Sequence, residues 1–452
     1  MTLALAFVGL LVGAGFATGQ EVIQYFVSWG YWGLIGAVIT GAIMSFAGAV
    51  LFQWGSYYLA DEHNYVFRKV THPLMSRVLD LVTTITLFGI GFVMLAGAGS
   101  NLNQQFGLDT WIGSVIMVGL VLATGFLDVD KVTRVIGAVT PVIIIAVFVA
   151  LIITLMNMPE NLGELNAVAE AKDSSMATWW ISALNYTGLA LSMGVSMMLV
   201  IGGNQSSPRA AWYGGLLGGI VFSVMLFILS VVLFLNIEKV GGLALPLLGV
   251  FDEMHPAVGF VVSLVIYAMI FNTAIGMFYA LGRRIAGNDR KKFKIYFVAV
   301  VLVGFAVSFM GFKTAIDKVY PILGWIGLGL VGLLCVNWFR HRARIKEELK
   351  RRERLADLAE RVVVDSEEDL TDKEKEEVRR LVDESHMNSQ ELWEAIREDA
   401  AEEAGEEYIP NKNDEDFIPN DPEGDSPHKE TAVTNDEAAD GNFKAADKNK
   451  PS

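Results

Sequence analysis

The sequence predicts an all-α integral membrane protein with about ten transmembrane helices, followed by an acidic C-terminal tail that is partly helical and partly disordered. Three observations lead to this prediction. The chain of 452 residues is 53% hydrophobic, with a mean hydropathy of +0.42. Apolar runs of roughly 18 or more residues, long enough to cross a bilayer, recur along it. Its charge is uneven: residues 341–452 hold 18 Lys/Arg and 34 Asp/Glu, whereas the first 340 residues carry a net charge of +1.

Polar breaks divide residues 1–340 into ten apolar segments, which form the predicted transmembrane domain. If these are two sets of five, the repeats cover about residues 1–157 and 178–340. Because each half has an odd number of spans, the two halves cross the membrane with opposite orientations, so the repeat is inverted. A semi-apolar stretch after the seventh segment, IEKVGGLALPLLGVFDEMHP, is expected to fold back on the bundle as an outer loop. The predicted segments are about 2–28, 31–59, 77–104, 109–127, 132–157, 178–203, 212–236, 257–284, 293–311 and 319–340.

The basic residues of the loops predict the orientation. With the N-terminus inside, twelve Lys and Arg residues fall in cytoplasmic loops and four in outer loops. By the positive-inside rule, this places both termini in the cytoplasm, in a multi-pass protein of the cell (cytoplasmic) membrane. We expect the largest basic cluster to contact anionic lipid rather than nucleic acid. It consists of Arg283, Arg284, Arg290, Lys291, Lys292 and Lys294.

The first predicted span contains GAGFATGQE at residues 13–21, where a continuous helix is unfavourable. Each Gly costs about 1 kcal/mol in a helix interior relative to Ala, and Gly13, Gly15 and Gly19 fall within seven residues. Irregular backbone at membrane depth persists only where it is buried in protein or lines a wet cavity. The free N–H and C=O groups of such a break suit a zwitterion or a cation. The alternative is that these glycines only let two helices approach closely.

A second interrupted segment occupies the corresponding place in the other half. Residues 185–205, NYTGLALSMGVSMMLVIGGNQ, carry glycines and serines through the sixth span. Interrupted hydrophobic segments at matching places in two halves indicate a transporter site near the middle of the membrane. The sequence therefore predicts broken first and sixth helices.

At this point the sequence resembles a known family. GAGFATGQE within ten spans is similar to the YkvI-like bacterial membrane proteins, which are related to the amino acid–polyamine–organocation superfamily. The similarity covers roughly residues 1–340. It implies the five-plus-five inverted-repeat fold of the leucine-transporter type. VGAGF (12–16) resembles the G-x-G break of the first helix in those proteins, and LSMGVS (191–196) resembles the L-S-x-G-x-G of their sixth helix, with Ser196 in place of the last glycine.

The resemblance implies a substrate site at the two breaks, where backbone groups bind the carboxylate and amine of an amino-acid-like solute. Asn185 and Tyr186 precede the second break, where a role in the cavity and a role in helix packing are equal alternatives. Gln20 and Gln24 lie within one turn of Glu21, within reach of a hydrogen bond to its carboxylate. The residues implied at the breaks themselves are Gly13, Ala14, Gly15, Ser192, Met193 and Gly194.

The resemblance also implies a sodium site made by the Gly9 and Val12 carbonyls with Asn272 and Thr273, oxygen ligands that suit a hard cation. Phe16 stands where the sodium-coupled leucine transporters have an asparagine, so a second sodium site is not implied. Glu21 is a carboxylate within a span, which is costly without a partner or water. It is interpreted as a proton carrier or an amine ligand, with a solvated or structurally paired residue as the alternative.

The tail begins at His341. Residues 341–403 are expected to form charged cytoplasmic helices, with Thr371 and Asn388 as caps, and residues 404–452 an acidic disordered segment. The function predicted is secondary active transport of a small amino-acid-like solute, coupled to Na⁺ or H⁺ by alternating access, with no enzyme activity and no cofactor beyond the coupling ion. The alternative is a transport-inactive sensor or scaffold of the same fold that signals through its tail. The expected partners are the solute and the lipid bilayer; a cytoplasmic protein partner of the tail is left open.

Overall fold

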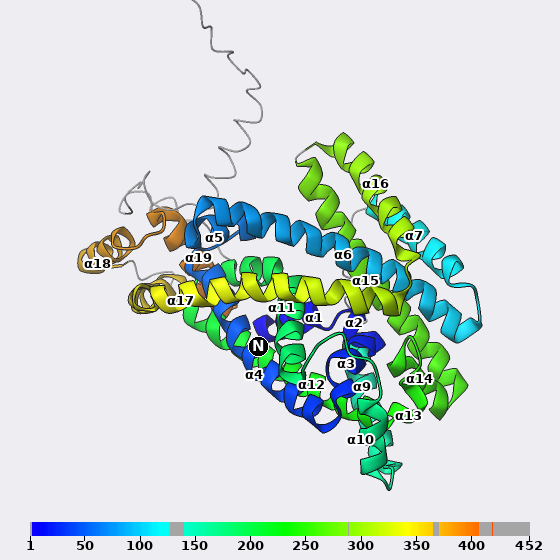
Figure 1. Ribbon diagram of the computed structural model, residues 1–452. Helices are drawn as coiled ribbons and strands as arrows, with labels where there is room; N and C mark the ends of the chain where they lie inside the picture. The colour runs from blue at the N-terminus through cyan, green and yellow to red at the C-terminus, as the bar shows by residue number, and fades with distance from the viewer. Residues whose placement is uncertain (1, 127–139, 288, 365–369, 406–417, 419–452) are drawn as a thin grey trace, which may run out of the picture.

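The computed structural model describes residues 2–126, 140–287, 289–364, 370–405 and 418. All secondary-structure elements in this part of the chain are helices. The long helices α6 (Pro73–Phe106) and α17 (Phe312–Val364) run side by side across the molecule (Figure 1). We call the end of the bundle near the tail helices the tail side, and the other end the far side.

The described helices correspond to the ten expected segments. The first is divided into α1 (Thr2–Leu11), α2 (Ala14–Thr18) and α3 (Gln20–Tyr25). Among the described residues, six helical stretches are long and apolar enough to cross a membrane, and three shorter apolar helices accompany them. The break in the first span and the all-α membrane fold are thus confirmed. Besides α6 and α17, the remaining segments are α4 (Gly30–Tyr57), α7 (Thr110–Gly125), α9 (Thr140–Met156), α11 (Trp179–Gly203), α12 (Pro208–Leu235), α15 (Pro256–Ala286) and α16 (Arg290–Ser308).

The sixth span differs from the prediction, because α11 is an uninterrupted helix from Trp179 to Gly203. Its glycines serve close packing instead of a break. A Cβ at Gly188 would lie 2.2 Å from the carbonyl oxygen of Gly324 in α17, and one at Gly202 would lie 2.3 Å from the carbonyl oxygen of Phe52 in α4. Only glycine permits backbones to approach this closely, which is how small residues commonly act between membrane helices.

Short helices cover the two ends of the bundle. On the tail side, α5 (His63–Val70) packs against α6. The 3₁₀ turn η1 (Val27–Trp29) and α10 (Leu162–Glu170) lie on the far side, with α13 (Ile237–Val240) and α14 (Pro246–Met254). The last two come from the loop expected to fold back. It does so, since Leu247, Leu248 and Phe251 are buried and α14 contacts α2 and α3.

The tail is joined to the bundle by a continuous helix, since α17 passes through residue 340 without a break. Thr371 and Glu374 form the expected capping box at the start of α18 (Asp372–Asp383). The side chain of Asn388 caps α19 (Ser389–Ala404), as expected. Apolar side chains of α17, α18 and α19 form a cluster of their own, together with Leu59. The predicted disorder of residues 404–452 falls almost entirely outside the described residues.

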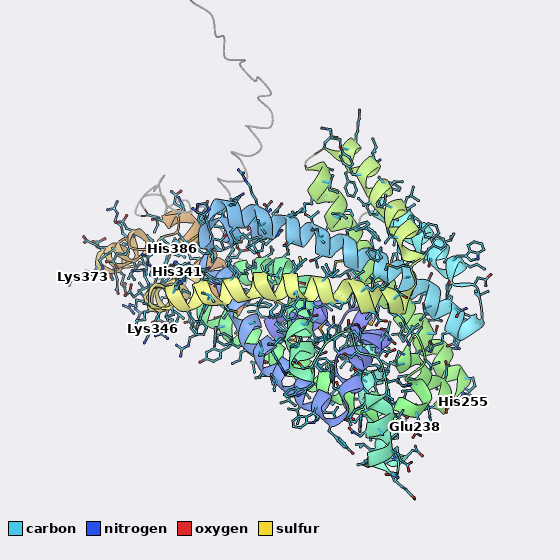
Figure 2. The ribbon with its side chains drawn as sticks, viewed as in Figure 1. Glu238, His255, His341, Lys346, Lys373 and His386 are labelled. Carbon is cyan, nitrogen blue, oxygen red and sulfur yellow. The ribbon has the colours of Figure 1, made fainter. Side chains whose placement is uncertain are left out.

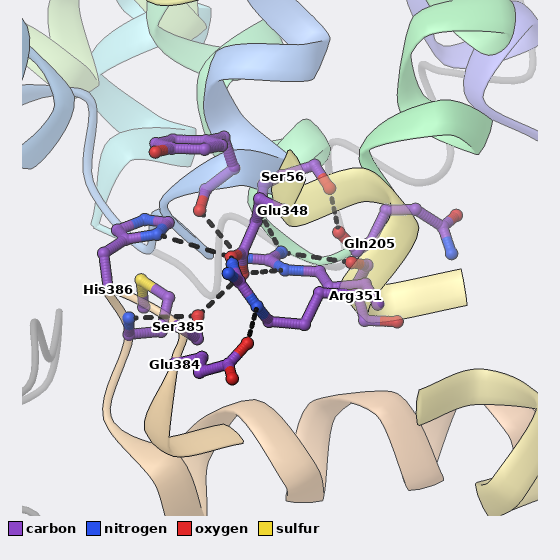
Figure 3. A network of polar contacts seen from close by, with 11 residues as sticks. Ser56, Gln205, Glu348, Arg351, Glu384, Ser385 and His386 are labelled. Carbon is purple, nitrogen blue, oxygen red and sulfur yellow. Dashed lines mark hydrogen bonds and ion pairs between the residues drawn. The ribbon is translucent and has the colours of Figure 1, made fainter. Parts of the chain in front are cut away.

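A buried polar network holds the tail against the tail side of the bundle (Figure 3). The Arg352 guanidinium donates hydrogen bonds to the carbonyl oxygens of Ser56 and Tyr57, both at 2.8 Å, and to that of Ser206 at 3.1 Å. Its Nε also donates to Glu348 at 2.9 Å. Both side chains are almost fully buried, so an unpaired partner would leave an uncompensated charge. Through Arg352, the tail is therefore hydrogen-bonded to both the end of α4 and the start of α12.

Candidate functional site

The first span is broken twice, and glycine is used at both points. Gly13 has extended backbone (φ −95°, ψ −169°) between α1 and α2. Gly19 has φ +76° between α2 and α3, a left-handed conformation that favours glycine. The Thr18 hydroxyl donates to the Gly15 carbonyl oxygen at 2.8 Å and accepts from the Gln20 N–H at 3.3 Å. Local hydrogen bonds thus replace part of the lost helical ladder.

The carboxylate of Glu21 turns back onto the segment between these breaks. A Cβ at Gly15 would lie 2.3 Å from Glu21 Oε2 and 2.7 Å from Cδ. Gly15 is therefore needed to make room for this carboxylate. Glu21 is 5% exposed, and Gln20 beside it is 4% exposed. The hydrogen bond between Gln20 and Glu21 that their spacing allows is not made among the described residues: Glu21 accepts from Tyr186, and the Gln20 N–H donates to Thr18. The contact of Glu21 with Gly15 could be seen only in three dimensions.

Tyr186 and Asn185 connect α11 to the broken first span by hydrogen bonds. The Tyr186 hydroxyl donates to Glu21 Oε1 at 3.2 Å. The Tyr25 hydroxyl donates to Asn185 Oδ1 at 3.1 Å, while Asn185 Nδ2 donates to the Pro321 carbonyl oxygen at 2.9 Å. Asn185 also fits against Gly324, where a Cβ would lie 2.2 Å from its Oδ1. Tyr186 thus contacts the carboxylate, whereas Asn185 joins α3, α11 and α17.

Aromatic side chains that the sequence did not single out lie beside Tyr186 and near Glu21. The Tyr186 ring lies 5.4 Å from that of Tyr25 and 5.0 Å from that of Phe26. Tyr320 is fully buried, and its hydroxyl has no hydrogen-bond partner among the described residues. Tyr25 could have been found from its spacing, one helical turn after Glu21. Tyr320, nearly 300 residues away, left no local signal apart from the Pro321 next to it.

The other predicted residues of the sixth span do not form a second break in the helix. The Ser192 hydroxyl donates to the Leu189 carbonyl oxygen of its own helix at 2.8 Å. Met193 is partly buried against the hydrophobic core. A Cβ at Gly194 would lie 3.5 Å from Leu11 Cδ2, which places Gly194 near the end of α1. Because α11 is continuous, these residues do not offer the free backbone groups that a second break was expected to provide.

The predicted ion ligands are only partly brought together. Thr273 of α15 reaches the first break, where its Oγ1 accepts from the Ala14 N–H at 3.3 Å. A Cβ at Gly13 would lie 3.6 Å from the same Oγ1. Val12 is buried beside the break, whereas Gly9 is exposed. Asn272 makes no hydrogen bond within the part of the chain that the structure describes.

The far side of the site is closed by the returning loop. A Cβ at Gly19 would lie 3.3 Å from the Leu247 backbone nitrogen of α14. The loop is itself held to α6, because Gln104 exchanges two hydrogen bonds of 2.9 Å with the Leu245 backbone. α14 therefore covers the left-handed turn that positions Glu21.

Comparisons with known proteins agree with this architecture. No protein-family model matches the chain. It is similar to the membrane protein YkvI of Bacillus subtilis (strain 168), with 27% identity over 345 residues, or 75% of this chain and 97% of YkvI. YyaD of the same organism is 24% identical over 337 residues, or 74% of this chain and 94% of YyaD. The resemblance to YkvI-like proteins stated from the sequence is confirmed.

Two solved structures show the fold. The inward-facing conformation of Mhp1 matches with a TM-score of 0.58 and 13% identity, covering 76% of this chain and 77% of Mhp1. MhsT in complex with L-phenylalanine matches with a TM-score of 0.57 and 15% identity, covering 88% of this chain and 95% of MhsT. The chain is thus a multi-pass membrane protein that resembles YkvI in sequence and has the inverted-repeat fold of leucine-transporter-type secondary transporters.

Proposed function

We propose that the protein is a secondary active transporter of a small amino-acid-like solute, coupled to Na⁺ or H⁺ by alternating access. The observation that carries this proposal is the buried Glu21 carboxylate, which lies against the broken first helix and accepts a hydrogen bond from Tyr186. A carboxylate at membrane depth is costly, so one kept beside irregular backbone marks a functional site by default. The fold shared with Mhp1 and MhsT supports transport rather than catalysis.

The charge of the site favours a solute with an amino group. Residues 2–59 and 179–207, which supply the first two spans and α11, contain no Lys, Arg or His. Glu21 is therefore the ionisable group that these helices offer to a cation or a proton. The binding of L-phenylalanine by MhsT is compatible with an amino-acid-like solute.

We propose that sodium, if it is the coupling ion, binds at the first break through the carbonyls of Gly9 and Val12 and the side chains of Asn272 and Thr273. The contact between Thr273 Oγ1 and the Ala14 N–H supports this placement. We further propose that the tail side is cytoplasmic, in the cell membrane. Arg284, which contacts His63 of α5, lies at that end. Lys346 and Lys373 lie there too, whereas Glu238 lies at the other end (Figure 2).

The decisive experiment compares proton-driven uptake with counterflow exchange in proteoliposomes that contain Glu21→Gln. If Glu21 carries the proton, uptake is abolished while exchange, which needs no net proton movement, is retained. If Glu21 binds the solute amine, both activities fall together. Glu164→Gln, at an exposed position of α10, is the matched control.

Two outcomes contradict the proposal. Changes of no more than about twofold in both activities, the scale of a weak exposed charge interaction, would show that Glu21 is not part of the site. Absence of saturable, gradient-dependent uptake by the unaltered protein, across amino acids and amines, would favour the transport-inactive sensor or scaffold. A thermal-stability screen against such compounds identifies the solute first, because a ligand stabilises the protein by mass action.

A further inference from the structure

A pocket of about 660 Å³ opens at the tail-side rim of the bundle, away from the Glu21 site. It lies where the end of α4 and the start of α12 meet α17, just beyond the apolar part of α17. This volume is within the range of about 300–1,000 Å³ that is common for ligand pockets. We call it the rim pocket, and the residues that define it are Gln53, Trp212, Tyr213, Trp338, Arg342 and Lys346.

The wall of the rim pocket is aromatic and held in place. The rings of Trp212 and Trp338 stack with centroids 5.2 Å apart and planes at 16°. Trp338 Nε1 donates to Gln53 Oε1 at 2.7 Å, and Gln53 Nε2 donates to the Pro208 carbonyl oxygen at 3.1 Å. Both polar ends of the buried Gln53 are therefore satisfied within the protein. Trp and Tyr in such positions are typical of the boundary between hydrocarbon and lipid headgroups.

The rim of the pocket is cationic. Arg342 and Lys346 are exposed and four residues apart on α17, so they lie on one face of the helix. Within the described part of the chain, neither has an acidic partner. A third cation, Arg209, is paired with Glu353 at 2.5 Å. Two positive charges thus remain to meet an anion at this rim.

Apolar side chains continue from the cationic rim toward the middle of the membrane. Phe339 and Val336, about one turn apart on α17, are each 52% exposed. Tyr213 and Leu217 of α12 are 52% and 50% exposed. A free phosphate would use only the cationic rim, whereas a phospholipid would use the rim for its headgroup and the apolar surface for its acyl chains.

We propose that the rim pocket binds one anionic glycerophospholipid of the tail-side leaflet. Arg342 and Lys346 hold the phosphate, the stacked Trp212 and Trp338 support the glycerol region, and one acyl chain lies along Phe339. Basic pockets between membrane helices are suited to such headgroups. This site is separate from the transport site and does not depend on the transport function.

Native mass spectrometry of the delipidated full-length protein, titrated with phosphatidylglycerol or phosphatidylcholine, tests the proposal. Each Lys or Arg near an anionic lipid surface contributes a factor of about five in affinity, so Arg342→Gln with Lys346→Gln should weaken phosphatidylglycerol binding about 30-fold. Arg342→Lys with Lys346→Arg keeps both charges and should retain the lipid. The matched control is Lys373→Gln with Arg379→Gln, two exposed cations of α18, which belongs to the tail and not to the bundle.

A second measurement excludes loss of folding as the cause. Phosphatidylglycerol should raise the melting temperature of the unaltered protein and of the control, but not of the Arg342/Lys346 double glutamine variant, because only a bound ligand stabilises by mass action. Equal loss of lipid in the variant and the control would overturn the site, as would equal affinity for the two lipids. Displacement of the lipid by an equimolar amount of inorganic phosphate would overturn the assignment to a lipid.

Discussion

Replacing Gly15 with alanine tests the contact on which the candidate site depends, because it places a methyl group where the Glu21 carboxylate lies. The added Cβ would be 2.3 Å from Glu21 Oε2, well inside the usual contact distance of about 3.5 Å. The obstructing atoms are the end of a flexible side chain, so the carboxylate should turn away while the backbone stays. This movement breaks the hydrogen bond from Tyr186, and overpacking of this kind costs about 1–3 kcal/mol.

A double-mutant cycle measures this contact directly. The free energy of unfolding is determined by detergent titration for Gly15→Ala, Glu21→Ala and the variant with both changes. We expect the double variant to be more stable than the sum of the single effects predicts, with an interaction energy of about 1–2 kcal/mol, as for residues in contact. Gly276→Ala is the control, because a Cβ there meets nothing within 4 Å. Additivity within about 0.5 kcal/mol would refute the placement of the carboxylate against Gly15.

Three further changes test other parts of the structure. Gly188→Ala should lower the free energy of unfolding by about 3 kcal/mol in the same titration, because its Cβ would lie 2.2 Å from a backbone oxygen of α17. Gly332→Ala, where the added Cβ meets open space, should not lower it, and equal effects of the two changes would contradict the close packing. Thr273→Ala should weaken the sodium dependence of uptake more than the solute affinity at saturating sodium, and an unchanged sodium response would favour protons. Burial and the charge of Arg284 lower the pKa of His63 from 6.5 to about 3. The free energy of unfolding that depends on neutral His63 is therefore fully present above pH 6.5 and is lost as the pH falls toward 3, with about 1 kcal/mol lost by pH 5.5. If the stability of a His63→Asn variant fell as steeply with pH as that of the unaltered protein, this explanation would be contradicted.

The sequence predicted the first span well because the signal there is local. Three glycines within seven residues disfavour a helix whatever surrounds them, and the structure breaks the chain at Gly13 and Gly19. The same reasoning failed for α11, where four glycines spread over residues 188–203 lie in a continuous helix. Glycine weakens a helix and also permits close packing, and only the neighbouring helices decide which effect prevails.

The sequence by itself determined the apolar spans, the break in the first of them and the caps of the tail helices, because each depends on residues a few positions apart. The tertiary structure alone decided that Tyr186 donates to Glu21, that Tyr320 is buried near the broken helix, and that Arg352 joins the tail to α4 and α12. These contacts link residues more than a hundred positions apart. No pattern in one segment records which distant side chain will fill the space beside it, because that choice is made by the packing of whole helices.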